Sequence, residues 1–200
     1  MTYSAAIFKK GDNQKNLFSG QMNKYNRIIN RLEITKDDHV LEIGCGWGGF
    51  AIHCAETKKS KIDAITISDS QYHFAKKRIA ASGLNNIIKV ILKDYRKIKS
   101  QYDHIVSIEM FEAVGRQFWR KYFRAIENNL KPGGKAIVQT IVIRDDLYKK
   151  YIKSTDFIRQ YIFPGGALPT VSIFEEKARD SGLDVTDKFY FGKDYAKTLD

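Results

Sequence analysis

A glycine-rich segment directly after an apolar run could bind a nucleotide-like cofactor. Residues 40–49 read Val-Leu-Glu-Ile-Gly-Cys-Gly-Trp-Gly-Gly, and Gly44, Gly46 and Gly48 leave the backbone bare. Glycine tolerates positive φ angles and lets a ligand lie against the main chain. A strand before this turn and a helix after it would point the helix N-terminus at the ligand. The glycines also fit G-x-G-x-x-G, the fingerprint of dinucleotide sites, so two cofactors compete for this segment.

Acidic residues distinguish the two cofactors. A dinucleotide site expects an acid at the end of the second strand, where this chain has Ile-Thr-Ile-Ser at 65–68. Asp94 and Tyr95, after the third strand, offer a carboxylate and a ring where an adenine would lie. Glu42 can organise the turn and the cationic end of an amino-acid-bearing cofactor, or it is a buried acid bound by backbone amides. Together these residues favour S-adenosylmethionine over NAD.

The elements that position these residues alternate between strands and helices, which is typical of a doubly wound, mostly parallel α/β sheet. The expected strands are 40–43, 62–67, 87–92, 102–108, 135–143 and 183–191. The expected helices are 22–32, 49–57, one capped by Ser68 or Asp69 and stopped at Gly83, 118–130 and 172–181. We expect one domain over 1–200, with an N-terminal helical cap at 1–36 and a lid-like insertion at 144–171.

The composition of the chain bears on its partners, on metal binding and on its location. The formal net charge of +11 favours a polyanionic partner, such as an anionic phospholipid membrane surface, or reflects solvated helix faces. No base-reading module is present, so no nucleic acid is expected. The two cysteines make no disulfide framework, and the four histidines lack metal-ligand spacing, so no metal is expected. No apolar run approaches about 20 residues. We therefore predict a cytoplasmic protein that is peripheral at the inner face of the membrane.

Two motifs in order are more specific than the glycine turn: Phe111-Glu112, and Tyr-Ile-Phe-Pro-Gly-Gly at 161–166. With these two motifs, the matching segments are 3–8, 41–50, 66–68 with Gln71, 94–96, 106–115, 139–141, 161–169 and 194–199. In these segments the chain resembles the cyclopropane-fatty-acyl-phospholipid synthases and mycolic acid cyclopropane synthases. The resemblance implies a class I S-adenosylmethionine-dependent methyltransferase fold. It also implies methyl transfer to the cis double bond of a phospholipid acyl chain.

The resemblance also assigns residues to the site. Its cofactor contacts correspond to Tyr3, Ser4, Gly44, Gly46, Thr66, Ile67, Gln71, Asp94 and Tyr95. An alkene is a poor nucleophile, and its methylation leaves a carbocation that must lose a proton, so the site needs a dry apolar slot, aromatic faces and a base. The aromatic faces could come from Phe111, Trp119, Tyr161 and Phe163. A single aromatic residue of this kind is more often part of the hydrophobic core. The base of the family is a bicarbonate held by a glutamate, a histidine and backbone amides. Glu112 matches the glutamate, and Ala5 and Ile141 match main-chain contacts.

The chain departs from the family at two positions of this site and at both ends. Ala113 stands in the family's Phe-Glu-His motif, and Gln139 replaces the histidine of its His-Thr-Ile strand. Because glutamine cannot carry charge, we expect weaker bicarbonate binding and slower ring closure. The chain ends before the family's last antiparallel strand, so strand 183–191 would lack its neighbour. We therefore expect a truncated chain, active or a remnant that still binds S-adenosylmethionine, with a complementing C-terminal chain or a homo-oligomer as partner. A methyltransferase with another substrate remains the alternative.

Overall fold

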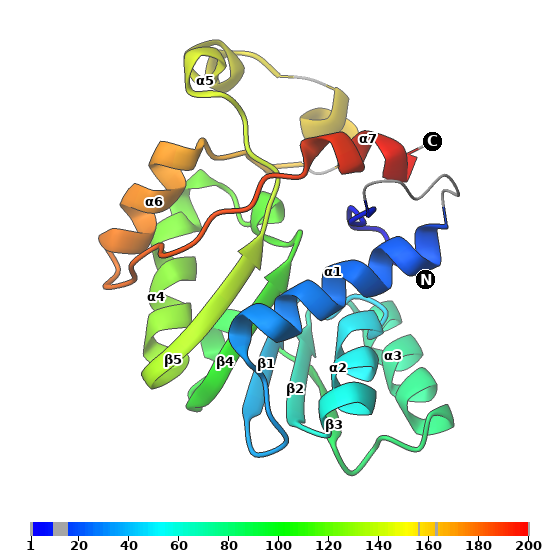
Figure 1. Ribbon diagram of the computed structural model, residues 1–200. Coiled ribbons are helices and arrows are strands. Elements are labelled where there is room, and N and C mark those ends of the chain that lie inside the picture. The colour runs from blue at the N-terminus through cyan, green and yellow to red at the C-terminus, as the bar shows by residue number, and fades with distance from the viewer. Residues whose placement is uncertain (1, 10–15, 156, 163, 200) are drawn as a thin grey trace.

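Five parallel strands form one sheet in the computed structural model, which describes residues 2–9, 16–155, 157–162 and 164–199 (Figure 1). The strands are β1 (His39–Ile43), β2 (Lys61–Thr66), β3 (Ile88–Leu92), β4 (Tyr102–Ile108) and β5 (Leu130–Gln139). Their order is β3-β2-β1-β4-β5, and every pairing is parallel. The order reverses at β1, and such sheets bind ligands beside this point, at the carboxyl ends of the strands. The predicted doubly wound fold is confirmed.

Helices cover both faces of the sheet, because each strand of a parallel sheet is apolar on both sides. One face carries α1 (Leu17–Leu32), α2 (Gly49–Lys58) and α3 (Asp69–Ala81), and the other carries α4 (Trp119–Asn129) and α6 (Val171–Arg179) (Figure 1). Neighbouring residues of β1 serve opposite faces: Val40 is buried beneath α1 and α2, and Leu41 is buried on the side of α4. This alternation places the core on both sides of the strand that leads to the glycine turn.

Local signals set several helix ends where the sequence predicts them. The Ser68 side chain accepts a hydrogen bond from the N–H of Gln71 at 3.3 Å and caps α3. Thr170 caps α6 in the same way through the N–H of Ile173, at 3.2 Å. Gly83 follows α3 with a φ of +67°. The predicted helices at 69–82, 118–130 and 172–181 are confirmed within one or two residues at each end.

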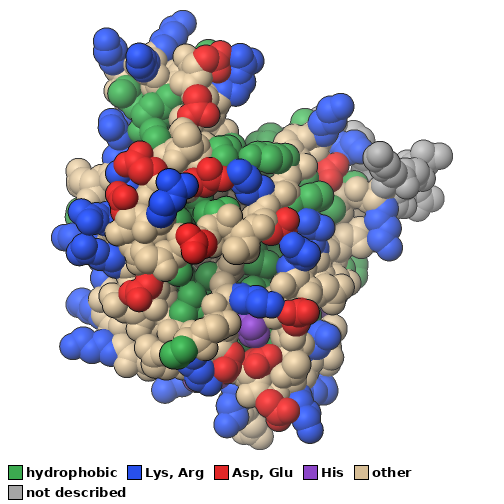
Figure 2. All heavy atoms as spheres, turned by 60° about the vertical axis from the view of Figure 1, so that its left-hand side comes forward, with side chains coloured by type: hydrophobic (Ala, Val, Ile, Leu, Met, Phe, Trp, Pro, Cys, Tyr) green, Lys and Arg blue, Asp and Glu red, His purple; other side chains and the backbone are tan. Residues whose placement is uncertain are grey.

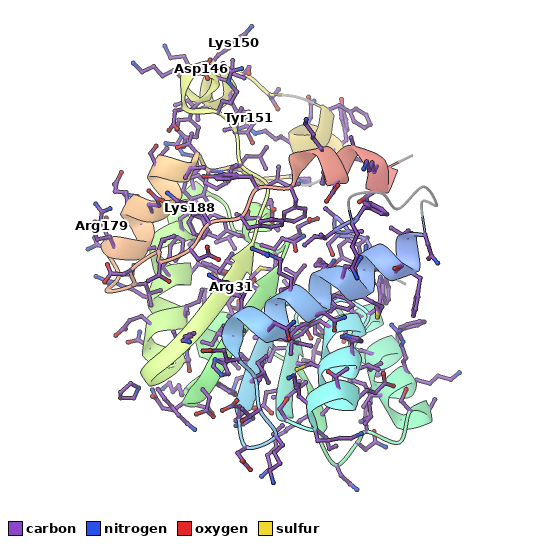
Figure 3. The ribbon with its side chains drawn as sticks, in the orientation of Figure 1. Arg31, Asp146, Lys150, Tyr151, Arg179 and Lys188 are labelled. Atoms are coloured by element: carbon purple, nitrogen blue, oxygen red, sulfur yellow. The ribbon has the colours of Figure 1, made fainter. Side chains whose placement is uncertain are left out.

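The predicted strand at 183–191 is wrong. This segment has no regular structure between α6 and α7 (Gly192–Leu199) and runs across β5 (Figure 1). Two ion pairs link this segment to neighbouring helices. Arg31 of α1 pairs with Asp187 at 2.8 Å, and Lys188 pairs with Glu175 of α6 at 2.5 Å (Figure 3). A strand needs a neighbour for its backbone groups, and the described residues contain no antiparallel strand beside β5.

Strand β5 also differs from its predicted bounds. It begins at Leu130 rather than at Lys135, so that it includes Gly133 and Gly134, and it ends at Gln139 rather than at Ile143. Its register with β4 shifts between Tyr102 and His104, so the glycines are absorbed as an irregularity in the ladder. As a consequence Gln139 is the last ladder residue, paired with Ile108 at the carboxyl edge.

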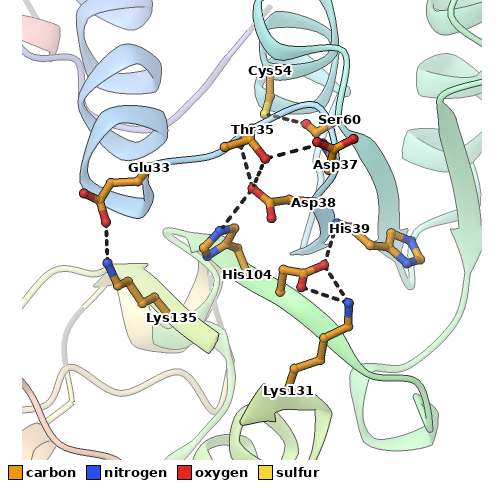
Figure 4. Close-up of polar contacts among 11 residues, drawn as sticks. Glu33, Thr35, Asp37, Asp38, His39, Cys54, Ser60, His104, Lys131 and Lys135 are labelled. Atoms are coloured by element: carbon orange, nitrogen blue, oxygen red, sulfur yellow. Dashed lines mark hydrogen bonds and ion pairs between the residues drawn. The ribbon is translucent and has the colours of Figure 1, made fainter. Parts of the chain in front are cut away.

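A polar network ties the opposite, amino-terminal edge of the sheet (Figure 4). Asp103 accepts the N–H of His39 at 2.9 Å and pairs with Lys131 at 2.8 Å. His104 lies 3.5 Å from Asp38, and the same figure shows the 2.5 Å pair of Lys135 with Glu33 and the contact of Cys54 with Ser60. No metal-ligating cluster is found among the described residues. These contacts link β1, β4 and β5 far from the strand ends that bind ligands.

The predicted insertion at 144–171 contains α5 (Asp145–Lys153) and a short π-helical turn, Ile158–Ile162. α5 stands away from the sheet beyond the carboxyl ends of the strands (Figure 1). The N–H of Leu168 donates to the Tyr151 hydroxyl at 3.0 Å, which ties α5 to the return of the chain. The N–H of Ala167 donates to the carbonyl of Glu112 at 2.9 Å. The insertion is thus anchored at a predicted site residue. No helix in the described ranges is long and apolar enough to cross a membrane.

Candidate functional site

The glycine turn closes over the end of β2. The N–H groups of Gly44 and Cys45 donate to the carbonyl of Ile65, at 3.0 and 2.9 Å. Gly44 and Gly46 have φ angles of +79° and +52°, in the left-handed region that side chains rarely adopt. A Cβ on Gly44 would lie 2.7 Å from the Met110 side chain. The turn therefore requires glycine and keeps the backbone bare at the carboxyl edge of the sheet.

A pocket beside this turn is lined by five of the predicted cofactor residues. They are Tyr3, Ser4, Glu42, Gly44 and Gly46. Glu42 is 3% exposed, and its Oε2 has no hydrogen-bond partner among the described residues. Burial raises the pKa of this carboxyl well above its usual range, against the opposing effects of the Ala51 N–H and of Lys24. A buried carboxyl without a partner is costly, so the pocket suits a ligand that brings a cationic or hydrogen-bond-donating group.

Gly48, the third predicted glycine, is not among the residues that line the pocket. It is the N-cap of α2, with a φ of +78°. A Cβ at this position would meet Ala75 of α3 at 3.4 Å. Its glycine is explained by the backbone angle and by the close packing of α2 on α3.

A chain of hydrogen bonds joins three predicted cofactor residues from distant parts of the sequence. The Thr66 hydroxyl donates to Gln71 Oε1 at 2.7 Å, and Gln71 Nε2 donates to the Tyr3 hydroxyl at 3.1 Å. The Tyr3 ring also lies 3.6 Å from the point where a Cβ on Gly46 would be. The N-terminal segment is thus held against the ends of β1 and β2, where the sequence placed the cofactor.

The remaining cofactor candidates lie at the carboxyl ends of β2 and β3. Ile67 is 76% exposed, a large apolar side chain left open directly after β2. Asp94 is paired with Arg96 through both carboxylate oxygens, and this pairing lowers the pKa of Asp94. Tyr95 is half-buried, and its ring packs edge-on against Tyr122 at 5.6 Å. These residues share one edge with the glycine turn but do not line its pocket.

A second group of predicted residues meets at the ends of β4 and β5. The backbone N–H of Ala5 donates to Glu109 Oε1 at 2.9 Å, and Gln139 Nε2 donates to the same oxygen at 2.7 Å. The N–H of Glu109 in turn donates to the carbonyl of Gln139 at 2.8 Å. Ala5 and Gln139 were predicted here, and Glu109 was not. Its available signal was an acid directly after β4, three residues before Glu112.

Glu112 and Ile141 are also brought together as predicted. The N–H of Ile141 donates to Glu112 Oε1 at 2.5 Å. The other oxygen, Oε2, is buried without a partner among the described residues. Burial raises the pKa of Glu112, and the charge of Glu109 adds to the effect. Two carboxylates therefore share this edge of the sheet, one held by Ala5 and Gln139 and the other by Ile141.

Lys24 is a functional candidate that sequence reasoning missed, since a lysine in an amphipathic helix usually points to solvent. It is buried in α1, and its Nζ donates to Ser4 Oγ at 2.5 Å. Burial lowers the pKa of Lys24 from 10.5 to about 8, and the charges of Glu109 and Glu42 oppose that shift. The lysine therefore contacts Ser4, a residue of the pocket wall, and is influenced by the charges of both Glu42 and Glu109.

Phe111 and Trp119, two of the residues predicted to supply aromatic faces, belong to the core. Phe111 is fully buried and packs against Trp119, Tyr122, Phe123 and Phe174 at centroid distances of 4.9–5.5 Å. Tyr161 is exposed in the π-helical turn, and Phe163 lies outside the described residues. The cluster around Phe111 supports the loop that carries Glu112.

The C-terminal helix holds the N-terminal segment in place. The N–H of Ala6 donates to Thr198 Oγ1 at 3.0 Å, and the N–H of Phe8 donates to Asp194 at 3.2 Å. Tyr195 of α7 has a raised pKa, first through burial and then through the charges of Glu109 and Glu112. Segments from both ends of the chain thus close around the two carboxylates.

Several known proteins are similar to this chain in sequence and in fold. Tuberculostearic acid methyltransferase UfaA1 of Mycobacterium tuberculosis is 36% identical over all of this chain and 48% of its own length. Cyclopropane-fatty-acyl-phospholipid synthase of Escherichia coli strain K12 is also 36% identical, over 49% of its length. The crystal structure of mycolic acid cyclopropane synthase CmaA1 complexed with SAH and CTAB matches with a TM-score of 0.88 at 27% identity. That match covers 99% of this chain and 72% of CmaA1.

The chain spans about half the length of the first two relatives. A sequence model of one family, described as mycolic acid cyclopropane synthetase, matches residues 1–200. This match spans the whole of the chain, and the fold and the glycine turn agree with it. The chain therefore belongs to the mycolic acid cyclopropane synthetase family.

Proposed function

We propose that the chain binds S-adenosylmethionine in the pocket beside the glycine turn. The observation that carries this proposal is the buried Glu42 carboxyl, whose Oε2 lacks a partner on the pocket wall. The amino group of the cofactor's methionine part would supply the missing donor and positive charge. Its adenosine part would extend past Gly46 towards Ile67, Asp94 and Tyr95, at the ends of β2 and β3. The related CmaA1 was crystallised with SAH.

The reaction we propose is methyl transfer to the cis double bond of a phospholipid acyl chain, with formation of a cyclopropane ring. When bound, the cofactor supplies an electrophilic methyl group. The chain's own residues would hold the acyl chain against this group, exclude water and remove a proton. Glu109 and Glu112, which follow β4 at this edge of the sheet, could accept that proton. The names of the E. coli and mycobacterial relatives support a lipid acyl substrate.

Titration calorimetry with S-adenosylmethionine and with NAD tests the cofactor. We expect S-adenosylmethionine to bind and NAD not to bind, and Glu42→Gln to weaken the binding because it removes the anionic partner. Binding of NAD alone would contradict the site assignment. Gas chromatography of fatty acids from expressing cells then tests the reaction. Cyclopropane fatty acids should appear in a host that otherwise lacks them, and a chain that binds cofactor without making them would be a catalytic remnant.

We further infer that the protein contacts an anionic membrane surface through α5 and the π-helical turn after it. Lys149, Lys150 and Lys153 are exposed on α5, and Lys150 points outward (Figure 3). In Figure 2 basic side chains gather on the projecting part that carries α5. Exposed apolar side chains lie on the same insertion: Leu147, Phe157, Tyr161 and Ile162. Lysines near apolar groups favour the interface of anionic bilayers, and such contact would bring acyl chains to the carboxyl edge of the sheet.

A further inference from the structure

We propose that the Glu109 carboxylate takes the place of bicarbonate and is the proton acceptor of the acyl-chain reaction. The role of Glu109 as proton acceptor rests on the proposed function. Its occupancy of the anion position can be measured without any activity.

The hydrogen-bond donors expected to hold bicarbonate are already engaged by the protein. Glu109 Oε1 receives the N–H of Ala5 at 2.9 Å and the side-chain amide of Gln139 at 2.7 Å. The N–H of Ile141 donates to Glu112 at 2.5 Å. An anion that needs these three donors would have to displace two carboxylates from them. The residues present therefore do not suit a bound bicarbonate.

Charge leads to the same conclusion. The negative charge of Glu109 already adds to burial in raising the pKa of Glu112 and of Tyr195. A bicarbonate would bring another negative charge to this half-buried place, and Lys24 is the buried cation beside it. A further anion without its own cation is disfavoured there.

Gln139 suits a tethered carboxylate better than a free anion. A free anion must be captured from solution, for which a charged imidazole is the stronger partner. A carboxylate attached to the chain needs only orientation, and the neutral amide of Gln139 supplies it with one N–H. The backbone adds a further restraint, because the Glu109 N–H donates to the Gln139 carbonyl at 2.8 Å. Gln139 was expected to weaken the binding of bicarbonate. In our proposal Glu109 replaces that ion, and Gln139 orients the Glu109 carboxylate.

The backbone at Glu109 points to a functional position. Its φ is +46°, in the left-handed region that non-glycine residues rarely enter. Such strained residues persist where surrounding contacts hold them, and they cluster at active sites. Here the contacts are the hydrogen bonds to Ala5 and Gln139. They direct the side chain toward the N-terminal segment that also forms the cofactor pocket.

The proposed step moves one proton. After methyl transfer, the neighbouring carbon of the former double bond carries a positive charge. A C–H bond of the added methyl group breaks, its electron pair forms the third C–C bond of the ring, and the proton goes to the Glu109 carboxylate. Oε2 of Glu109 has no hydrogen-bond partner among the described residues, which leaves it available. Because Glu109 is partly exposed, it can return the proton to solvent.

The first test measures occupancy with ¹³C-labelled bicarbonate by NMR line broadening. We expect no binding to the wild type and binding to Glu109→Gly, in which the donors of Ala5 and Gln139 are freed. Glu33→Gly is the matched control, because Glu33 also has a left-handed backbone, with a φ of +58°, and its side chain pairs with Lys135 at the opposite edge of the sheet. Bicarbonate binding to the wild type would overturn the proposal. So would the absence of binding to Glu109→Gly, since the place would then not be an anion site.

The second test measures cyclopropane formation, which requires the proposed proton transfer, in buffer stripped of carbon dioxide, with and without added bicarbonate. The wild-type rate should change less than about twofold, whereas Glu109→Gln, which fills the site without charge, should lose about 10²- to 10⁴-fold. Bicarbonate should restore part of the rate of Glu109→Gly. A wild-type rate that depends on bicarbonate, or full activity in Glu109→Gln, would overturn the proposal. A wild type that forms no cyclopropane would instead refute the proposed reaction, and the occupancy test would still show whether Glu109 fills the anion position.

Discussion

The Nζ of Lys24 donates a 2.5 Å hydrogen bond to Ser4 Oγ and so joins α1 to the N-terminal segment inside the protein. Glu42 and Glu109 both act on this lysine through their charges. One buried cation therefore connects the pocket of the glycine turn with the carboxylate held by Ala5 and Gln139. A substitution at Lys24 should therefore alter both the pocket and the Glu109 carboxylate.

Lys24 should make stability depend on pH. The pKa of Lys24 is about 8 in the folded protein, compared with 10.5 for an exposed lysine. Between these values the unfolded chain binds more protons, so the free energy of unfolding rises with pH, by up to about 3 kcal/mol over the window. Lys24→Met should lose this rise, as measured by urea unfolding at several pH values from 8 to 10.5. Lys61→Met, at an exposed position of β2, should keep the wild-type slope, and an unchanged slope in Lys24→Met would refute the assignment.

Gly46 should be required for cofactor binding and not for folding. A Cβ there would project into the pocket toward the Tyr3 ring, at 3.6 Å, where the cofactor must approach the backbone. We expect Gly46→Ala to weaken S-adenosylmethionine binding at least tenfold in calorimetry, and Gly46→Val to abolish it. Gly83→Ala is the control, because Gly83 has a φ of +67° with open space around it. Both alanine variants should lose about 1 kcal/mol of stability, and only Gly46→Ala should lose binding.

Glu112→Gln should separate catalysis from stability. Burial raises the pKa of Glu112, so the ionised form costs stability as pH rises above the ordinary range of a glutamate. A neutral amide removes that cost and keeps an acceptor for the Ile141 N–H. We expect the variant to unfold at a higher denaturant concentration than the wild type at pH 7, to bind cofactor normally, and to lose cyclopropane formation. Full activity measured by gas chromatography would show that the Glu112 charge is not used.

The basic face of α5 should bind membranes in a salt-dependent way. A double variant, Lys149→Glu with Lys150→Glu, should lose co-sedimentation with phosphatidylglycerol vesicles at low salt, since each lysine near the surface is worth about 1 kcal/mol. Lys58→Glu with Lys59→Glu makes the same charge change at the C-terminal end of α2, away from α5 (Figure 1), and should retain binding. Equal losses in both would mean that net charge, rather than α5, draws the protein to lipid. Equal wild-type binding to neutral vesicles would exclude an electrostatic contact.

Local chemistry made the sheet and the glycine turn predictable. The turn has positive φ angles at Gly44 and Gly46, which glycine adopts without steric cost, and Ser68 caps α3 with its own side chain. The apolar runs of β1 and β4 are buried on both faces and read as strands without knowledge of their neighbours. The segment 183–191 has a similar pattern but remained without strand structure, because a strand also depends on a partner that its own residues do not encode.

The sequence by itself determined the fold class, the family and the cofactor edge, because each depends on backbone angles, periodicity and motifs within short stretches. Only the tertiary structure decided which groups meet there. Ala5 and Glu109 are 104 positions apart, and Glu109 reaches the donors of Ala5 and Gln139 because parallel strands end at one edge and α7 holds the N-terminal segment against it. The burial of Lys24 arose in the same way, since a lysine's surroundings are set by distant packing and not by its helix.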